Sequence, residues 1–122
     1  MEKKKILIVD DEKELIEVFT LRLRSSGYEV LSAFDGESGL EKARNEKPDL
    51  ILLDVVMPKQ DGLKVCRQLK HESALASTPV ILLTAKDQAD PKRILSDTKA
   101  DAIFMKPFDP QELLAAIKKL IK

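Results

Sequence analysis

Three aspartates in this sequence come directly after short aliphatic runs, where a buried strand delivers its last side chain to the edge of a sheet. Asp10 and Asp11 follow the run 6–9, and Asp54 follows the run 50–53. Two carboxylates about 4 Å apart repel by up to about 4 kcal/mol at an effective dielectric near 20. Mg²⁺ relieves such repulsion, because it takes oxygen ligands and is commonly held by one or two carboxylates and a phosphate oxygen. Three converging acids therefore predict a Mg²⁺ site that receives a phosphoryl group.

A hydroxyl and an ammonium end two later aliphatic runs. Thr84 follows the run 80–83, and Lys106 follows the run 102–105. An aspartate is ionised at neutral pH and can attack phosphorus without a general base, giving an acyl phosphate. A hydroxyl and an ammonium beside it would share the charge of the phosphoryl oxygens with the metal. The chemistry predicted around Asp54 is therefore phosphoryl transfer to a carboxylate.

The segments that carry these residues alternate in type. Aliphatic runs predict strands at 6–9, 28–34, 50–53, 80–83 and 102–105, and apolar residues at helical spacing predict a helix after each strand. Turn and capping signals bound these helices at Ser25-Ser26-Gly27, Asp35-Gly36, Asp61-Gly62, Asp90-Pro91 and Asp109-Pro110-Gln111-Glu112. Continuously aliphatic strands indicate a parallel sheet that is covered on both faces.

The predicted fold class is α/β, with a five-stranded parallel sheet of order 2-1-3-4-5 and five helices on its two faces, the doubly wound, flavodoxin-like arrangement. The first and third strands are neighbours in this order. Asp10, Asp11 and Asp54 should therefore meet beyond the carboxyl ends of the strands, where such sheets bind ligands. We expect residues 1–122 to form a single domain, because this length suits one hydrophobic core.

Composition excludes several classes of function. The 21 Lys and Arg residues balance 21 Asp and Glu residues, so no net field attracts nucleic acid or an anionic membrane. No apolar run approaches the length that spans a bilayer. Cys66, the only cysteine, cannot form an internal disulfide and has the helical spacing of a core residue. We expect a cytoplasmic protein that binds neither nucleic acid nor membrane directly.

Each candidate residue also has an ordinary structural interpretation when it is taken alone. Asp10 and Asp11 suit the first turn of a helix, Asp54 suits a cap, Thr84 suits a strand and Lys106 suits a solvated surface. Those interpretations do not explain why each residue directly follows an aliphatic run. His71 has no such placement, and we interpret it as an exposed residue without a chemical role.

The motifs together match a known family. They are Val9-Asp10-Asp11, Asp54 with Met57-Pro58 and Asp61-Gly62, Thr84-Ala85, and Lys106-Pro107-Phe108. Over essentially its whole length the chain resembles the receiver domain of two-component response regulators. The resemblance implies that Asp54 is phosphorylated by a histidine kinase's phosphohistidine or by a small acyl phosphate, in a Mg²⁺-dependent reaction.

The resemblance also implies roles for individual residues. Asp11, Asp54 and the backbone carbonyl of Val56 would hold Mg²⁺ directly, and Asp10 would act through water. Such domains are phosphoacceptors and not enzymes on other substrates; they catalyse only their own phosphotransfer and dephosphorylation. Val56 and Lys86 flank the site and offer no carboxylate or amide to orient a water, so we expect slow self-dephosphorylation.

Thr84 and the backbone N–H of Ala85 would contact the phosphoryl oxygens, Lys106 would pair with them, and the bond before Pro107 would be cis. The family usually has Tyr or Phe three residues before the lysine, where this sequence has Ile103. We therefore expect a weaker rearrangement linked to Thr84, or one that uses the neighbouring Phe104 differently. By resemblance, that rearrangement changes the surface formed by the helix after Asp90, the strand 102–105 and the last helix.

A second departure is Lys99, where the family commonly has glycine before Ala100-Asp101. A left-handed helix end there would cost a non-glycine residue about 1 kcal/mol. Asp101-Ala102-Ile103 also lacks the Asp-Asp-Tyr of many regulators that dimerise through this face, which lowers the expectation of that dimer. The helix after Asp90 carries only Ile94 and Leu95 as large apolar residues and should be loosely held.

Other classes of function are less consistent with the sequence. An aspartate-nucleophile phosphohydrolase normally has a second aspartate two residues after the first, where this chain has Val56. Nucleotide-binding glycine loops follow none of the strands. A receiver-like interaction domain that works without phosphate is the remaining alternative. The cognate kinase or phosphotransfer protein, the downstream partner or effector domain and the oligomeric state stay open, as does whether the receiver belongs to a longer regulator.

Overall fold

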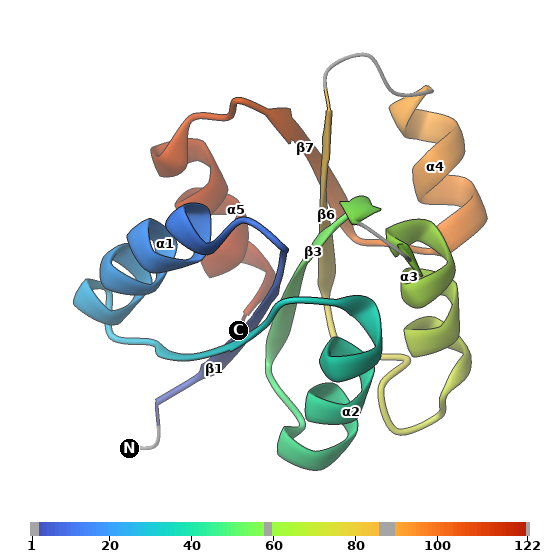
Figure 1. The fold of residues 1–122 in the computed structure, drawn as a ribbon, viewed down its shortest axis with the longest axis horizontal. Helices are drawn as coiled ribbons and strands as arrows, with labels where there is room; N and C mark the ends of the chain where they lie inside the picture. Colours follow the sequence, from blue (N-terminus) through green and yellow to red (C-terminus); the bar gives the residue numbers. More distant parts are fainter. Residues whose placement is uncertain (1–2, 58–59, 86–89, 122) are drawn as a thin grey trace.

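A computed structural model describes residues 3–57, 60–85 and 90–121, with the side chain of Gln60 excepted. In these residues one sheet has five parallel strands in the order β2-β1-β3-β6-β7, as predicted (Figure 1). The strands are β1 (Lys5–Val9), β2 (Glu29–Ala33), β3 (Leu50–Asp54), β6 (Val80–Ala85) and β7 (Ala102–Lys106). The parallel register aligns Val9 of β1 with Leu53 of β3, so the residues that follow them leave the sheet at the same edge.

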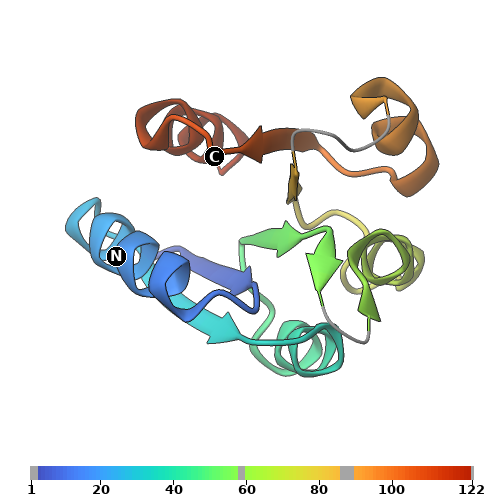
Figure 2. The same cartoon turned by 45° about the horizontal axis from the view of Figure 1, so that its top comes forward.

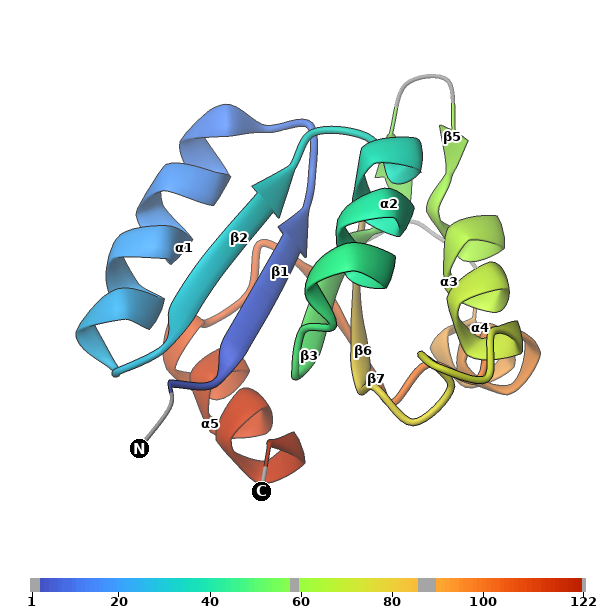
Figure 3. The same ribbon diagram turned by 90° about the horizontal axis from the view of Figure 1, so that it is seen from below.

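Five helices cover the two faces of the sheet in the described part of the chain. They are α1 (Lys13–Ser25), α2 (Gly36–Glu46), α3 (Gly62–His71), α4 (Pro91–Thr98) and α5 (Pro110–Leu120). Figures 2 and 3 show α1 and α5 on one face and α2, α3 and α4 on the other. None of the helices in the described ranges combines the length and the apolar character that crossing a bilayer requires.

The core is divided into two layers by the sheet. The layer under α2, α3 and α4 includes Leu7, Leu53 and Cys66, and the layer under α1 and α5 includes Ile8 and Phe19. All five residues of β3 are buried, which explains its continuous aliphatic run. Burial of Leu113 and Ile117 fixes α5 to the sheet.

Most helix boundaries follow the predicted signals. The side chain of Asp35 caps α2 by accepting a hydrogen bond from the Ser38 N–H, and Asp90 caps α4 by accepting one from the Lys92 N–H. Gly27 follows Ser26, the C-cap residue of α1, and has a φ of 95°, a value that glycine adopts without steric cost. His71 is exposed at the end of α3, as expected.

A short antiparallel pair, β4 (Val56–Met57) and β5 (Gln60–Asp61), was not predicted. Each strand has two residues, too few for a periodic signal. The turn expected at Pro58 lies between them, outside the described residues. The pair brings the chain back so that α3 begins beside the end of β3.

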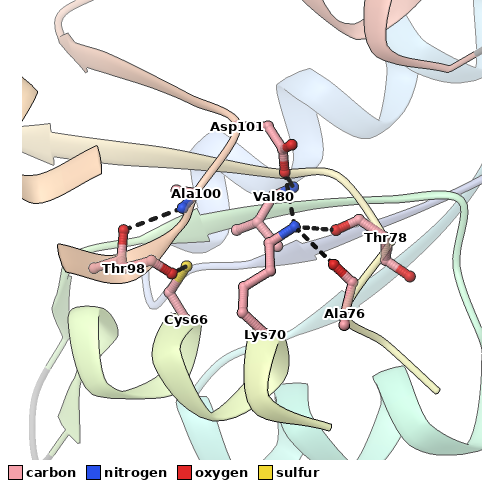
Figure 4. Close-up of polar contacts among 8 residues, drawn as sticks. All are labelled: Cys66, Lys70, Ala76, Thr78, Val80, Thr98, Ala100 and Asp101. Carbon is pink, nitrogen blue, oxygen red and sulfur yellow. Dashed lines mark hydrogen bonds and ion pairs between the residues drawn. The ribbon is translucent and has the colours of Figure 1, made fainter. Parts of the chain in front are cut away.

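The amino end of β6 is linked to α3 and to the loop before β7 through Lys70 (Figure 4). The Lys70 Nζ atom lies 2.8 Å from the Thr78 carbonyl oxygen and 2.9 Å from Asp101 Oδ2. The same Asp101 oxygen accepts a hydrogen bond from the Val80 N–H at 2.8 Å. These contacts lie at the amino ends of the strands, whereas Asp54 lies at the carboxyl ends.

Packing of α4 uses more than its two large apolar residues. Ile94 is buried, and Thr98 is also buried, with its hydroxyl bonded to the Ile94 carbonyl at 2.7 Å. The Cys66 Sγ atom lies 3.7 Å from the Thr98 carbonyl oxygen, so Cys66 is a packed core thiol, as predicted. The expectation of a loosely held α4 stays a prediction.

Candidate functional site

Asp10, Asp11 and Asp54 meet at the carboxyl edge of the sheet. One carboxylate oxygen from each lies within 4.8 Å of the others. Asp10 is fully buried and Asp54 is 4% exposed, while Asp11 is exposed. The convergence follows from the parallel pairing of β1 with β3. Oxygen donors in this arrangement match the preference of Mg²⁺.

Local hydrogen bonds orient the two buried carboxylates. Asp10 Oδ1 accepts a hydrogen bond from the Glu12 N–H at 2.9 Å, and Asp54 Oδ1 accepts a longer one from the Val56 N–H at 3.3 Å. Behind Asp54, a Cβ atom added at Gly62 would lie 2.2 Å from the Asp54 carbonyl oxygen. The start of α3 therefore requires glycine.

Lys106 ends β7 and extends its ammonium into the cluster. Its Nζ atom lies 3.1 Å from Asp10 Oδ2, 3.0 Å from Glu12 Oε1 and 3.6 Å from Asp54 Oδ2. The following bond to Pro107 is cis, the conformation that the resemblance implies. The ammonium partly compensates the negative charge of Asp10 and Asp54, while Asp11 stays exposed to solvent.

Burial dominates the electrostatics of the site. Burial first, and the charge of Asp10 second, raise the pKa of Asp54 to about 6, against smaller opposing effects of Lys106 and the Val56 N–H. Burial also raises the pKa of Asp10 above its usual range. For Lys106, burial alone would lower the pKa, but the hydrogen bond to Glu12 and the charges of Asp10 and Asp54 outweigh it and raise the pKa. The cluster thus favours a cation.

Thr84 brings a buried hydroxyl to the same edge. It is 1% exposed at the end of β6, and its Oγ1 atom has no hydrogen-bond partner among the described residues. A buried hydroxyl without a partner costs about 1–3 kcal/mol. Such an atom is suited to a ligand that accepts its hydrogen bond, as a phosphoryl oxygen does. Ala85 follows Thr84 and pairs with Lys106 across the sheet.

Ile103 and Phe104 point to opposite faces of β7. Ile103 is partly buried and packs against the layer under α2, α3 and α4, whereas Phe104 packs against the layer under α1 and α5. The Phe104 ring meets the Phe108 ring edge-on, with centroids 6.5 Å apart. Close to Asp54 in the chain, Val56 is 53% exposed, and its side chain provides no polar group to the site.

The residues predicted to take part in the chemistry come together, and the sequence does not reveal two further residues of the site. Glu12 contacts Lys106, but nothing in the local sequence indicates a contact between residues that far apart. The sequence predicts only a turn at Gly62, and its close approach to the Asp54 carbonyl becomes visible only in three dimensions. Lys86, predicted to flank the site, lies outside the described residues.

The fold and this cluster correspond to a known class of domain. Residues 6–118 match the response regulator receiver domain family, and the chain belongs to that family. Receiver domains are signalling domains of two-component systems, which work with histidine kinases and downstream effectors.

Individual relatives support this assignment. The chain is 44% identical over 119 residues to the alkaline phosphatase synthesis transcriptional regulatory protein PhoP of Bacillus subtilis, covering 98% of this chain and 49% of PhoP. Among solved structures, the chemotaxis protein CheY4 of Vibrio cholerae is 30% identical with a TM-score of 0.89, covering 98% and 99% of the two chains. The receiver domain of a histidine kinase from Syntrophus aciditrophicus is 34% identical with a TM-score of 0.85, covering 97% and 89%.

The relatives differ in what they do beyond the receiver. They include a transcriptional regulator, a chemotaxis protein and part of a histidine kinase. The chain spans about half the length of the curated relatives that it matches. Family membership therefore defines the signalling domain and leaves its output open.

Proposed function

We propose that Asp54 accepts a phosphoryl group and that its phosphorylation switches the domain. The observation that carries this proposal is the convergence of Asp10, Asp11 and Asp54 beside Lys106 and an unpartnered Thr84 hydroxyl. An Asp54 oxygen forms a bond to phosphorus while the donor's P–N or P–O bond breaks and its electron pair leaves with the donor. The donor is a phosphohistidine of a histidine kinase or phosphotransfer protein, or a small acyl phosphate.

The carboxylates suit Mg²⁺ in distinct ways. Both oxygens of Asp10 already accept hydrogen bonds, from the Glu12 N–H and from Lys106, which supports a contact through water. Asp11 is exposed, and the contacts of Asp54 are longer, at 3.3 Å from the Val56 N–H and 3.6 Å from Lys106 Nζ. These two carboxylates, with the Val56 carbonyl, are therefore the proposed direct ligands. Bound Mg²⁺ supplies positive charge that offsets the charge of the transferring phosphoryl group.

The remaining contacts stabilise the transferred group. The Thr84 hydroxyl and the Ala85 N–H donate hydrogen bonds to the phosphoryl oxygens, and the Lys106 ammonium pairs with them. Drawing Thr84 and Lys106 inward shifts the balance between two arrangements of the α4–β7–α5 surface. Ile103, which lies on the α4 side of β7, takes part in place of the usual aromatic residue.

The proposed function belongs to a cytoplasmic signalling protein that binds neither membrane nor nucleic acid through this domain. Its partners are a sensor histidine kinase or a phosphotransfer protein and a downstream effector. The domain catalyses only its own phosphotransfer and a slow dephosphorylation. The apolar, exposed Val56 supports the slow hydrolysis, because it cannot orient a water for attack on phosphorus.

Intact-protein mass spectrometry after incubation with acetyl phosphate and Mg²⁺ tests the proposal. We expect one phosphoryl adduct on the native chain and none on Asp54→Asn or in EDTA. Asp97→Asn, which removes an exposed aspartate of α4, is the matched control and should keep the adduct. An absence of adduct under every condition would favour a phosphate-independent interaction domain.

A further inference from the structure

In this structure the Lys106 ammonium lies closer to Glu12 and Asp10 than to Asp54. Its Nζ atom is 3.0 Å from Glu12 Oε1 and 3.1 Å from Asp10 Oδ2, but 3.6 Å from Asp54 Oδ2. Of these three acids, Glu12 alone stands outside the carboxylate cluster that suits Mg²⁺. The position of the ammonium therefore depends on a residue with no part in metal binding.

The Glu12 side chain does not serve its own helix. Glu12 is the N-cap residue of α1, and its side chain makes no capping hydrogen bond. Its carboxylate instead accepts a hydrogen bond from Lys106 at the end of β7, 94 residues further along the chain. This contact joins the first and last parts of the site.

We propose that Glu12 is a positioning residue that holds the Lys106 ammonium in the unphosphorylated protein and competes for it with the phosphoryl group on Asp54. The proposal rests on the proposed function above. When the phosphoryl group bonds to an Asp54 oxygen, its oxygens attract Lys106, and the contact with Glu12 must weaken or break. Glu12 thus lowers the affinity of the site for a phosphoryl group.

The expected effect is modest because the Glu12 side chain is 58% exposed and the Lys106 side chain 20% exposed. Exposed ion pairs are worth little, since water and salt screen them. Removing the Glu12 charge should therefore raise affinity for a phosphoryl mimic by about 2–5-fold at low salt. The gain should shrink as salt is added.

Titration with beryllium fluoride in the presence of Mg²⁺ measures this affinity directly, by ¹⁹F NMR or calorimetry. Glu12→Gln, which keeps the shape and removes the charge, should bind the mimic about 2–5-fold more tightly than the native chain. Glu12→Asp keeps the charge but is one methylene shorter, so it should also bind more tightly. Native-like binding by Glu12→Asp beside tighter binding by Glu12→Gln would mean simple repulsion of the anion, and would overturn the proposal.

A second background tests whether the effect passes through Lys106. In Lys106→Met, the change Glu12→Gln should alter the affinity no further; a gain that persists there would overturn the proposal. Glu14→Gln, an exposed acid of the same helix turn, should bind like the native chain. The Lys106 side-chain NMR signals should shift in Glu12→Gln before any mimic is added, and unchanged signals would count against the contact.

The two proposals fail in different ways. Equal binding by the native chain and Glu12→Gln would overturn the role of Glu12 and leave Asp54 as the acceptor. If the native chain neither binds the mimic nor forms an adduct with acetyl phosphate, the proposed function is overturned, and the role of Glu12 falls with it.

Discussion

At Asp54, burial and the nearby charge of Asp10 raise the pKa to about 6, and this makes the stability of the metal-free protein depend on pH. An aspartate in the unfolded chain has a pKa of about 3.9. Between these two values the folded protein binds more protons than the unfolded chain, so the free energy of unfolding falls as the pH rises. Well below the unfolded-state pKa the carboxyl is protonated in both states and this loss disappears.

Asp54→Asn should therefore stabilise the metal-free protein. In EDTA we expect a gain of about 2–3 kcal/mol at pH 7.5 that fades toward pH 4, because the neutral amide avoids the cost of a buried charge. Asp10→Asn should also stabilise. Denaturant unfolding at several pH values measures both. Millimolar Mg²⁺ is the control and should reduce the gain; a gain independent of pH and of Mg²⁺ would contradict this account.

Lys99 shows how one backbone conformation affects stability. It ends α4 with a φ of 65°, in the left-handed region expected from the sequence. Lys99→Gly should raise the free energy of unfolding by about 1 kcal/mol, because glycine adopts this conformation without a Cβ clash. Ser96→Gly, at an exposed position inside α4, should instead destabilise by about 0.5 kcal/mol, because glycine has a lower helix propensity than serine. Thermal melts of both variants measure these effects, and a melting temperature of Lys99→Gly at or below the native value would contradict the prediction.

At the scale of elements, α3 and the loop before β7 are joined at the edge of the sheet opposite to Asp54. The Lys70 side chain is 10% exposed and donates to the Thr78 carbonyl and to Asp101 (Figure 4). Asp101 begins the segment Asp101-Ala102-Ile103, which stands where dimerising regulators have Asp-Asp-Tyr. In this chain its carboxylate is engaged within the same molecule.

Lys70→Met should destabilise the domain by about 1–3 kcal/mol, because it leaves the Thr78 carbonyl and the Asp101 carboxylate without this donor. Lys64→Met, which changes an exposed lysine of the same helix, should change stability by less than about 0.5 kcal/mol. Urea unfolding of the two variants gives the comparison. Equal effects would mean that the contacts of Lys70 add nothing beyond helix propensity.

In the proposed switch, Ile103 is the residue through which β7 responds to phosphorylation. Because Ile103 is aliphatic and partly buried against the α4 layer, we expect its rearrangement on phosphorylation to be weaker than that of Thr84. Amide chemical shifts should change strongly around Thr84 and only slightly around residue 103 when beryllium fluoride and Mg²⁺ are added. Changes of similar size at both places would contradict this expectation.

At the scale of the whole molecule, a cation that binds only the folded state raises its stability. Mg²⁺ at about ten times its Kd should add about 1.4 kcal/mol to the free energy of unfolding. Asp11→Asn should lose most of this gain, whereas Asp97→Asn should keep it. Melting curves over a range of Mg²⁺ concentrations provide the measurement, and an equal gain in all three proteins would place the cation elsewhere.

Much of this protein could be predicted from its sequence because its local signals agree with its fold. The aliphatic runs of β1, β3 and β6 are buried on both sides, so they identify a covered parallel sheet. With short connections and right-handed crossovers, that sheet has few possible strand orders. The order in turn places Asp10, Asp11 and Asp54 at one edge.

Only the tertiary structure determined which side chains interact across long separations. Two contacts join elements that are distant in sequence: that of Lys106 with Glu12 and that of Lys70 with Asp101. The approach of Gly62 to the Asp54 carbonyl depends on how the backbone is positioned there. The pair β4 and β5 is too short to leave a periodic signal. Composition and periodicity report which face of an element is buried, but the partners of a polar side chain depend on how the elements pack, and that is decided in three dimensions.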